Sequence, residues 1–365
     1  MLLQQRSFLP AEDPLARFPC GSPFELLDEL GRDLPSLLQS PHCRSYLQSI
    51  AIPPPEPQGS VPLSMAELRL YYLRLGFLAS AYINQVGQPV ATLLPKNIAR
   101  PLVAVCQLLG RPTILSYDGY ALFNWKRFDK TQAIALGNID TLQNFVHLYD
   151  EHWFILIHVE IEALAESIFS AIAEIDAALG KADERRLDGP RLNGALGNIA
   201  QALERQITVL KRIPEHMDAR LYYKTFRPYI RFFENVVFED VPQHAINFRG
   251  ETGAQSSIMP LLVSLMKIPH QASPLTDHLV DMRNYMPAEH RQIIDHVDAL
   301  PNFKTTAGRD AYNGVLDAMA RFREIHYDWA QQYINRWVDD PRGTGGTHYQ
   351  QWLKQLIDET RAAQK

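Results

Sequence analysis

The sequence is poor in cysteine. Only Cys20, Cys43 and Cys106 occur among 365 residues, and none belongs to a CxxC pair. This excludes a zinc ribbon and a thioredoxin-like redox pair, and it argues against a disulfide framework. The first residues, MLLQQRSFLPAEDP, lack the continuous apolar segment of a signal peptide. We therefore expect a cytoplasmic protein.

Long apolar runs and excess positive charge are also lacking. No apolar run approaches the roughly 18 residues of a transmembrane helix, so we expect no membrane association. The chain has 36 Lys+Arg against 41 Asp+Glu, a net charge of −5. No basic field is present to attract nucleic acid. Over the whole chain, 46% of the residues are hydrophobic and 21% are charged, which is the composition of a large globular protein.

Several catalytic motifs are absent. The G-x-S-x-G elbow of many serine hydrolases does not occur. No histidine has a glutamate three residues before it, as di-iron helix bundles require. His326 and Asp328 have the spacing that begins an iron facial triad, but residues two apart on a helix point to different faces.

Helical periodicity dominates the chain. Apolar residues recur at three- and four-residue intervals and no segment shows strand alternation, so we predict an all-α fold. The expected helices cover residues 23–38, 41–50, 64–82, 97–109, 139–179, 191–213, 218–237, 256–266, 274–282, 288–300, 309–338 and a last segment beginning at Thr347. A Pro-rich first part followed by long helices predicts two domains, a small N-terminal one over residues 1–138 and a large helical one over residues 139–365.

One histidine lies on the apolar face of its predicted helix. The neighbours of His326 at helical spacing are Met319, Phe322, Trp329, Ala330, Tyr333 and Ile334. A neutral imidazole in such surroundings suits an axial haem ligand, with Arg323 one turn earlier to meet a propionate. A core histidine satisfied by one hydrogen bond fits the same pattern, and both interpretations stay open.

A second candidate is Arg227, in an aromatic segment with Tyr222, Tyr223 and Tyr229. Pro228 disfavours helical backbone at Arg227, so we expect a kink there. A guanidinium presented at a kink suits a carboxylate, and the rings suit a flat substrate. A surface arginine stacked on a tyrosine is the alternative.

Two glycine-rich loops, at residues 249–257 and 342–347, each lead into a predicted helix. Glycine permits the backbone changes of a mobile lid, and a helix N-terminus suits an anion. Neither loop has the lysine of a phosphate-binding loop, and a plain connector fits equally well.

Six motifs occur in a characteristic order. They are residues 95–101 (PKNIARP), 111–117 (RPTILSY), 124–126 (NWK), 253–257 (GAQSS), 281–287 (DMRNYMP) with His290 and Arg291, and 343–347 (GTGGT). From about residue 95 to its C-terminus the chain resembles the indoleamine 2,3-dioxygenase family, haem enzymes that open the indole ring of tryptophan.

The resemblance implies roles for individual residues. His326 takes the place of the proximal haem ligand, and Arg323 that of an arginine near a haem propionate. Val263 stands where the family has the acidic partner of that arginine. Arg227 matches the arginine that holds the substrate carboxylate, and Thr344 matches the threonine that reaches the substrate ammonium.

The resemblance also assigns the lining of the distal pocket, the space over the haem face opposite His326. Two phenylalanines are replaced by Tyr222 and Tyr223. One wall is formed by Tyr117, Tyr120 and Ala121, the opposite wall by Trp153 with Phe154 or Ile157, and the rim by Gly250, Thr252 and Gly253. Tyr120 and Tyr222 are bulkier or more polar than the usual family residues.

The implied activity is the conversion of L-tryptophan to N-formylkynurenine, the first step of the kynurenine pathway. It requires haem b in the Fe²⁺ form, O₂ as co-substrate and an external reductant. We expect a monomer or weak oligomer. Two alternatives stay open, a haem protein that performs a different oxidation on an indole amino acid and a haem protein that binds O₂ without turnover. Arg227 and Thr344 favour an enzyme, because a gas sensor needs no amino-acid clamp.

Overall fold

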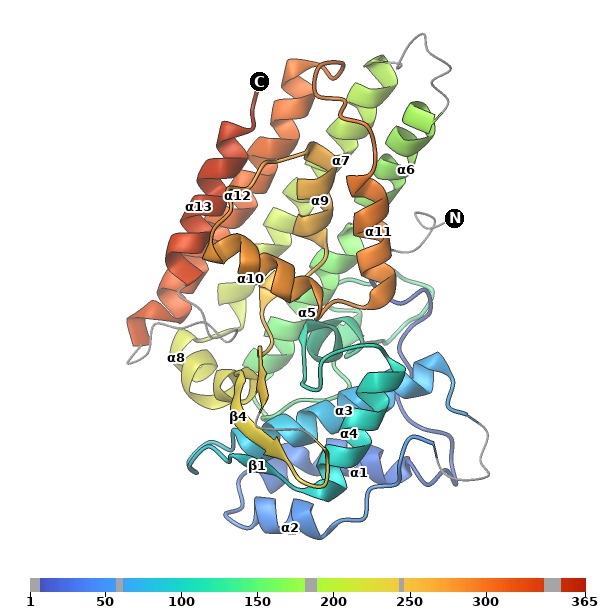
Figure 1. Cartoon of the computed structure of the whole chain (residues 1–365), viewed down its shortest axis with the longest axis vertical. Coiled ribbons are helices and arrows are strands. Elements are labelled where there is room, and N and C mark those ends of the chain that lie inside the picture. The colour runs from blue at the N-terminus through green and yellow to red at the C-terminus, as the bar shows by residue number, and fades with distance from the viewer. Residues whose placement is uncertain (1–6, 57–61, 181–188, 243–245, 338–348) are drawn as a thin grey trace.

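A computed structural model describes residues 7–56, 62–180, 189–242, 246–337 and 349–365, which are mainly helical (Figure 1). The all-α prediction is confirmed. The helices are α1 (Glu25–Leu37), α2 (Cys43–Ser49), α3 (Met65–Ile83), α4 (Lys96–Leu108), α5 (Tyr149–Leu164), α6 (Glu166–Gly180), α7 (Gly189–Leu210), α8 (Ala219–Leu221), α9 (Ile258–Met266), α10 (Pro274–Arg283), α11 (Ala288–Asp298), α12 (Arg309–Tyr333) and α13 (Tyr349–Ala362). The expected last helix corresponds to α13, but its predicted first residue, Thr347, lies outside the described residues.

Helix α3 forms the centre of a first hydrophobic core. It begins with a capping box, in which the Ser64 hydroxyl accepts a bond from the backbone of Glu67 and the Glu67 carboxylate accepts one from the backbone of Ser64. Every residue of α3 from Leu70 to its end is buried, and α1, α2 and α4 pack around it.

A second core joins the long helices α6, α7 and α12, which run side by side in the upper part of Figure 1. The contact between α7 and α12 is the most extensive between any two described elements, and α13 packs on α12. Within the described residues, no helix is long and apolar enough to cross a membrane.

Helix α5 contributes to both cores. Ile155 and Val159 belong to the first core, whereas Ile157 and Ile161 belong to the second. The first core also takes in later residues such as Phe233. The domain boundary at residue 138 stays a prediction.

Five short strands are found in the described part of the chain. β1 (Leu93–Leu94) pairs in parallel with β4 (Phe233–Phe238), and β5 (Ile246–Phe248) pairs with β4 in antiparallel orientation. β2 (Lys126–Arg127) and β3 (Ile139–Asp140) form a separate antiparallel pair.

The predicted helix over residues 218–237 was wrong at its end, because residues 233–237 belong to strand β4. An irregularity in the pairing between Phe233 and Val236 leaves these two buried residues three apart, a spacing typical of a helix. The predicted helix over residues 139–179 was wrong at its start, because α5 begins only at Tyr149 and a break at Ala165 separates it from α6.

Candidate functional site

The candidate site begins with His326 on α12. Its side chain keeps exposed surface, and desolvation by the surrounding protein lowers the pKa of its imidazole to about 4. Because its pKa is low, the imidazole is neutral at pH 7, which is the form that binds metals.

The helix face around His326 is aromatic. Phe322, one turn before, and Trp329, one turn after, are both half-buried and pack on the second core. The Trp329 indole N–H donates a hydrogen bond to the Leu210 carbonyl on α7 at 3.3 Å, which fixes its ring. The imidazole is therefore flanked by apolar surface along its own helix.

Arg323 is buried and is held by α13. Its guanidinium donates hydrogen bonds to the Leu356 carbonyl, at 2.9 Å, and to the Thr360 hydroxyl. Burial lowers its pKa to about 10, so it remains charged at pH 7. Val263 supplies no acid, and the arginine takes its neutral partners from α13 instead.

Arg227 lies where a π-helical turn, Tyr222–Phe226, meets a 3-10 turn, Arg227–Ile230. Its own backbone is right-handed helical, so the expectation that Pro228 would move it out of that region was wrong. The disruption takes the form of a change in helix type, a feature common at functional sites. The buried guanidinium lies 5.0 Å from the centre of the half-buried Tyr223 ring.

An aromatic wall is built around Phe154 of α5. Its ring centre lies 5.4 Å from that of Tyr222 and 6.3 Å from that of Tyr120. Trp153 instead packs on His216, and its indole N–H donates to the Arg212 carbonyl at 3.0 Å.

The other members of the predicted walls are buried. Ile157 lies within the second core, and Ala121 within the first. Phe154 is thus the member of the Trp153, Phe154 and Ile157 group that the structure brings next to Tyr120 and Tyr222.

Buried carboxyls lie beside the two wall tyrosines. The Tyr117 hydroxyl donates to Glu162 at 2.9 Å, and the Tyr120 hydroxyl donates to Glu151 at 3.1 Å. Burial raises the pKa of both carboxyls to about 7 and that of Glu251, in the 249–257 loop, to about 8. The three acids are therefore partly or wholly protonated near neutral pH.

The 249–257 loop connects this wall to α9. The Gln255 side chain accepts a bond from the Tyr117 backbone at 3.0 Å and donates one to the Gly250 carbonyl at 2.9 Å. Thr252 caps the short turn that contains Gly253. These bonds from Gln255 and Thr252 hold the loop in place and give its GAQSS motif a structural role.

One predicted residue, Thr344, lies outside the described residues, as does the rest of the 342–347 loop. One residue was missed: His158 lies one helical turn after Phe154 on α5 and influences the pKa of His326. Its four-residue spacing from Phe154 is the signal that could have found it. Among the described residues, no three His, Cys, Asp or Glu side chains gather as a metal-ion site.

Comparison with known proteins gives the family. The model of the indoleamine 2,3-dioxygenases matches residues 2–337. The chain belongs to the indoleamine 2,3-dioxygenase family.

Individual relatives of this family differ in what they do. The chain is 28% identical to an indoleamine 2,3-dioxygenase of Saccharomyces cerevisiae, over 97% of this chain and 90% of the relative. It is 26% identical to a 6-hydroxytryptophan 2,3-dioxygenase of Fusarium equiseti, over 90% and 82%. It is also 26% identical to a myoglobin of the abalone Haliotis madaka, over 94% and 92%.

Indoleamine 2,3-dioxygenases are haem-dependent, and the residues present fit a haem. The imidazole of His326 is neutral, and the aromatic side chains Phe322 and Trp329 flank it on α12. These residues fit a haem in two respects: a neutral histidine is a usual ligand of haem iron, and the side chains around it are apolar.

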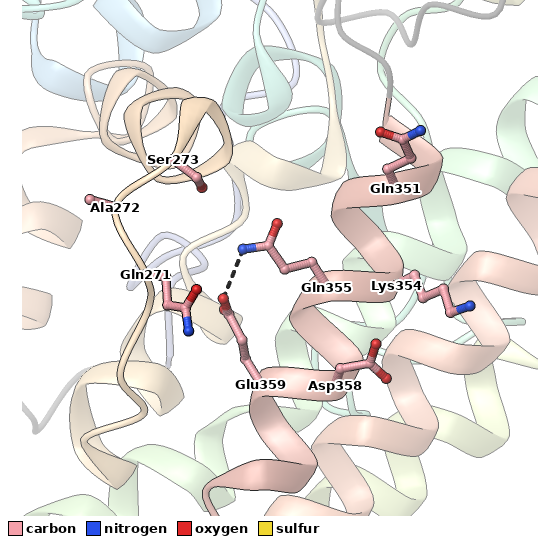
Figure 2. A pocket seen from close by; sticks show the side chains of 8 residues that line it. All are labelled: Gln271, Ala272, Ser273, Gln351, Lys354, Gln355, Asp358 and Glu359. Atoms are coloured by element: carbon pink, nitrogen blue, oxygen red, sulfur yellow. Dashed lines mark hydrogen bonds between the residues drawn. The ribbon is translucent and has the colours of Figure 1, made fainter.

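A separate cleft of about 560 Å³ lies between the segment before α10 and helix α13 (Figure 2). It is lined by Gln271, Ala272, Ser273, Gln351, Lys354, Gln355, Asp358 and Glu359. On the α13 side, Gln355 donates to Glu359 one turn later at 2.8 Å. Of the predicted site residues that the structure describes, none lines this cleft.

Proposed function

We propose that this chain is a haem-dependent dioxygenase that converts L-tryptophan to N-formylkynurenine by placing both atoms of O₂ across indole C2–C3. The proposal is supported above all by one juxtaposition. Tyr333, two turns after His326 on α12, contacts Tyr222 of the aromatic wall with 5.9 Å between ring centres, and Tyr222 lies in the same turn as Tyr223, on which the buried Arg227 stacks.

His326 would hold the iron through its neutral ring, and Arg323 carries the charge that suits a propionate. When bound, ferrous haem b supplies the activation of O₂. The reaction adds one O₂ to one tryptophan and consumes no electrons, so an external reductant is needed only to bring the iron to Fe²⁺.

The remaining work of the protein is to orient the substrate. Arg227 binds the carboxylate, and stacking on Tyr223 limits the movement of the guanidinium. Thr344 binds the ammonium. Phe154 and Tyr222 contact the indole ring, and the buried tyrosines Tyr117 and Tyr120, the second of which lies beside Phe154, exclude water from this part of the site.

A second candidate substrate is a hydroxylated indole amino acid. Tyr120 places a hydroxyl and, through Glu151, a carboxyl at the wall. Such groups can satisfy an additional hydroxyl on the indole, and a 6-hydroxytryptophan dioxygenase is among the relatives.

All three cysteines are free thiols, which suits the cytoplasmic setting that we propose. Tests of the function need only the purified full-length protein loaded with haem and reduced. We expect N-formylkynurenine from L-tryptophan in air, and His326→Ala protein should fail to retain haem while keeping its helical content. Haem retained equally by His326→Ala protein would contradict the ligand assignment.

A further inference from the structure

A buried ion pair lies behind the wall tyrosines. Arg111 pairs with Asp118, and their side chains are only 3% and 2% exposed. Asp118 is the first residue of a π-helical turn, Asp118–Leu122, which carries Tyr120 and directly follows Tyr117. The pair therefore lies where the wall segment begins.

The π-helical turn has two faces. On one face the hydroxyls of Tyr117 and Tyr120 donate hydrogen bonds to carboxyls of α5. On the other face Asp118 and Gly119 lie against Tyr72 of α3, where a Cβ added to Gly119 would lie 2.6 Å from a ring carbon. Whatever holds the rear face therefore also sets where the two wall tyrosines point.

Tyr72 joins Arg111 to the start of the turn. The Arg111 guanidinium stacks on the Tyr72 ring, 3.9 Å from its centre. The Tyr72 hydroxyl donates to the Ile114 carbonyl at 2.9 Å and accepts a bond from the Ser116 backbone at 2.9 Å. The segment thus wraps around one ring, which brings Arg111 to Asp118.

The shape of the turn matters for the wall. Its characteristic bond runs from the Phe123 backbone N–H to the Asp118 carbonyl at 2.8 Å, and the Asp118 carboxylate accepts a bond from the Gly119 N–H at 2.7 Å. Such turns are rare and are frequently found at functional sites. Because a π-helical turn holds more residues than an α-helical one, its loss would rotate Tyr120 relative to Tyr117.

The ion pair is a poor source of stability. Two of the guanidinium nitrogens of Arg111, Nε and Nη2, are buried and find no hydrogen-bond partner within the described residues. Moving charges and unsatisfied donors out of water costs free energy, and a well-packed apolar pair is often as stable as a buried ion pair. The arrangement of Arg111 and Asp118 therefore points to a role in geometry.

We propose that Arg111 and Asp118 are positioning residues, whose ion pair holds the π-helical turn so that Tyr117 and Tyr120 face the bound amino acid. Neither partner of the pair contacts the substrate. The inference rests on the proposed function. Removing the pair should therefore affect substrate binding more than stability, which a purely structural ion pair would not do.

The test replaces both charges by apolar side chains of similar size. The double variant Arg111→Met with Asp118→Leu removes the pair without leaving one charge buried alone. We expect its urea midpoint to match or exceed that of the wild type. Binding of L-tryptophan to the ferric haem-loaded protein, followed by the shift of the Soret band, should weaken about tenfold. The C–O stretching frequency of the ferrous CO complex should also shift, because it responds to polar groups on the distal side of the haem.

A conservative variant and a matched control complete the design. Arg111→Lys keeps the charge and should retain most of the affinity. The control removes a second buried ion pair, Arg127 with Asp13, whose charged atoms lie 2.8 Å apart and whose side chains are 10% and 8% exposed. This pair joins β2 to the N-terminal part of the chain, so Arg127→Met with Asp13→Leu should leave L-tryptophan binding unchanged.

Three outcomes would overturn the inference. Unchanged L-tryptophan binding in the double variant of Arg111 and Asp118 would overturn it and leave the proposed function intact. A double variant that fails to fold, or that loses stability and substrate binding together, would show that the pair is structural. Haem uptake by the wild type without any binding of L-tryptophan would overturn the proposed function as well.

Discussion

The phenol hydroxyl of Tyr117 donates a hydrogen bond to the buried carboxyl of Glu162 at 2.9 Å. Tyr117 belongs to the first hydrophobic core and Glu162 to helix α5, which contributes to both cores. The Ser256 hydroxyl donates to the same oxygen at 2.8 Å. Three segments distant in sequence are therefore joined at one carboxyl beside the proposed substrate wall.

Removing this bond should weaken the whole fold. Tyr117→Phe leaves the buried Glu162 with fewer donors, so we expect the free energy of unfolding to fall by about 1–3 kcal/mol. Urea denaturation measures it. Tyr46→Phe is the matched control, because Tyr46 is exposed, and it should change stability by less than about 0.5 kcal/mol. Equal effects of the two changes would contradict the importance of the bond.

The buried acid Glu251 should give stability a definite pH dependence. Burial raises its pKa from 4.5 to about 8. Between these values the unfolded chain has lost the proton that the folded protein keeps, so this residue makes stability fall as pH rises. Glu251→Gln removes the titration.

We therefore expect Glu251→Gln to gain stability over the wild type by more than about 1 kcal/mol between pH 5 and pH 8, measured by urea unfolding at constant ionic strength. The exposed Glu12→Gln serves as control. Parallel pH profiles of Glu251→Gln and wild type would show that Glu251 ionises as freely in the fold as in the unfolded chain.

Gly250 should tolerate no side chain. A Cβ there would lie 2.4 Å from the Ile230 carbonyl oxygen and 2.5 Å from the Arg231 carbonyl carbon, both backbone atoms. Gly250→Ala should lower the free energy of unfolding by about 1–3 kcal/mol. Gly253→Ala, three residues later with nothing within 4 Å of its Cβ, should change it little. A stable Gly250→Ala protein would refute this packing.

Arg227 should determine substrate affinity without affecting haem. Arg227→Ala removes a charge-assisted bidentate partner, so we expect KM for L-tryptophan to rise about 10- to 100-fold while the Soret band stays unchanged. Arg220→Ala, an exposed arginine of α8, is the control. Loss of haem with unchanged KM would reverse the roles that we assign.

The sequence predicted those features that depend on local pattern. The helix over residues 64–82 and the apolar face around His326 both depend on spacing along one helix, and the structure has them. Strand β4 was not predictable in this way, because an irregularity in its pairing gives Phe233 and Val236 the spacing of a helix. That irregularity arises only when β4 pairs with β5, and the local pattern of β4 does not show it.

At the site, helix α5 also could not be placed from its local sequence pattern. Its apolar residues face both cores, so no single apolar stripe tells which side chain faces the wall. Sequence alone therefore placed Trp153 on the wall with Phe154 or Ile157 and passed over His158. Only the packing of α5 against Tyr120 and Tyr222 brings Phe154, and with it His158, to the wall.

The central claim is that this chain completes the dioxygenation of L-tryptophan. The most direct measurement is the mass of the product that the ferrous haem-loaded protein forms from L-tryptophan under ¹⁸O₂, quenched promptly. The account predicts N-formylkynurenine that carries both labelled oxygen atoms. Unchanged tryptophan beside a persistent O₂ complex, or a product with only one labelled atom, would contradict it.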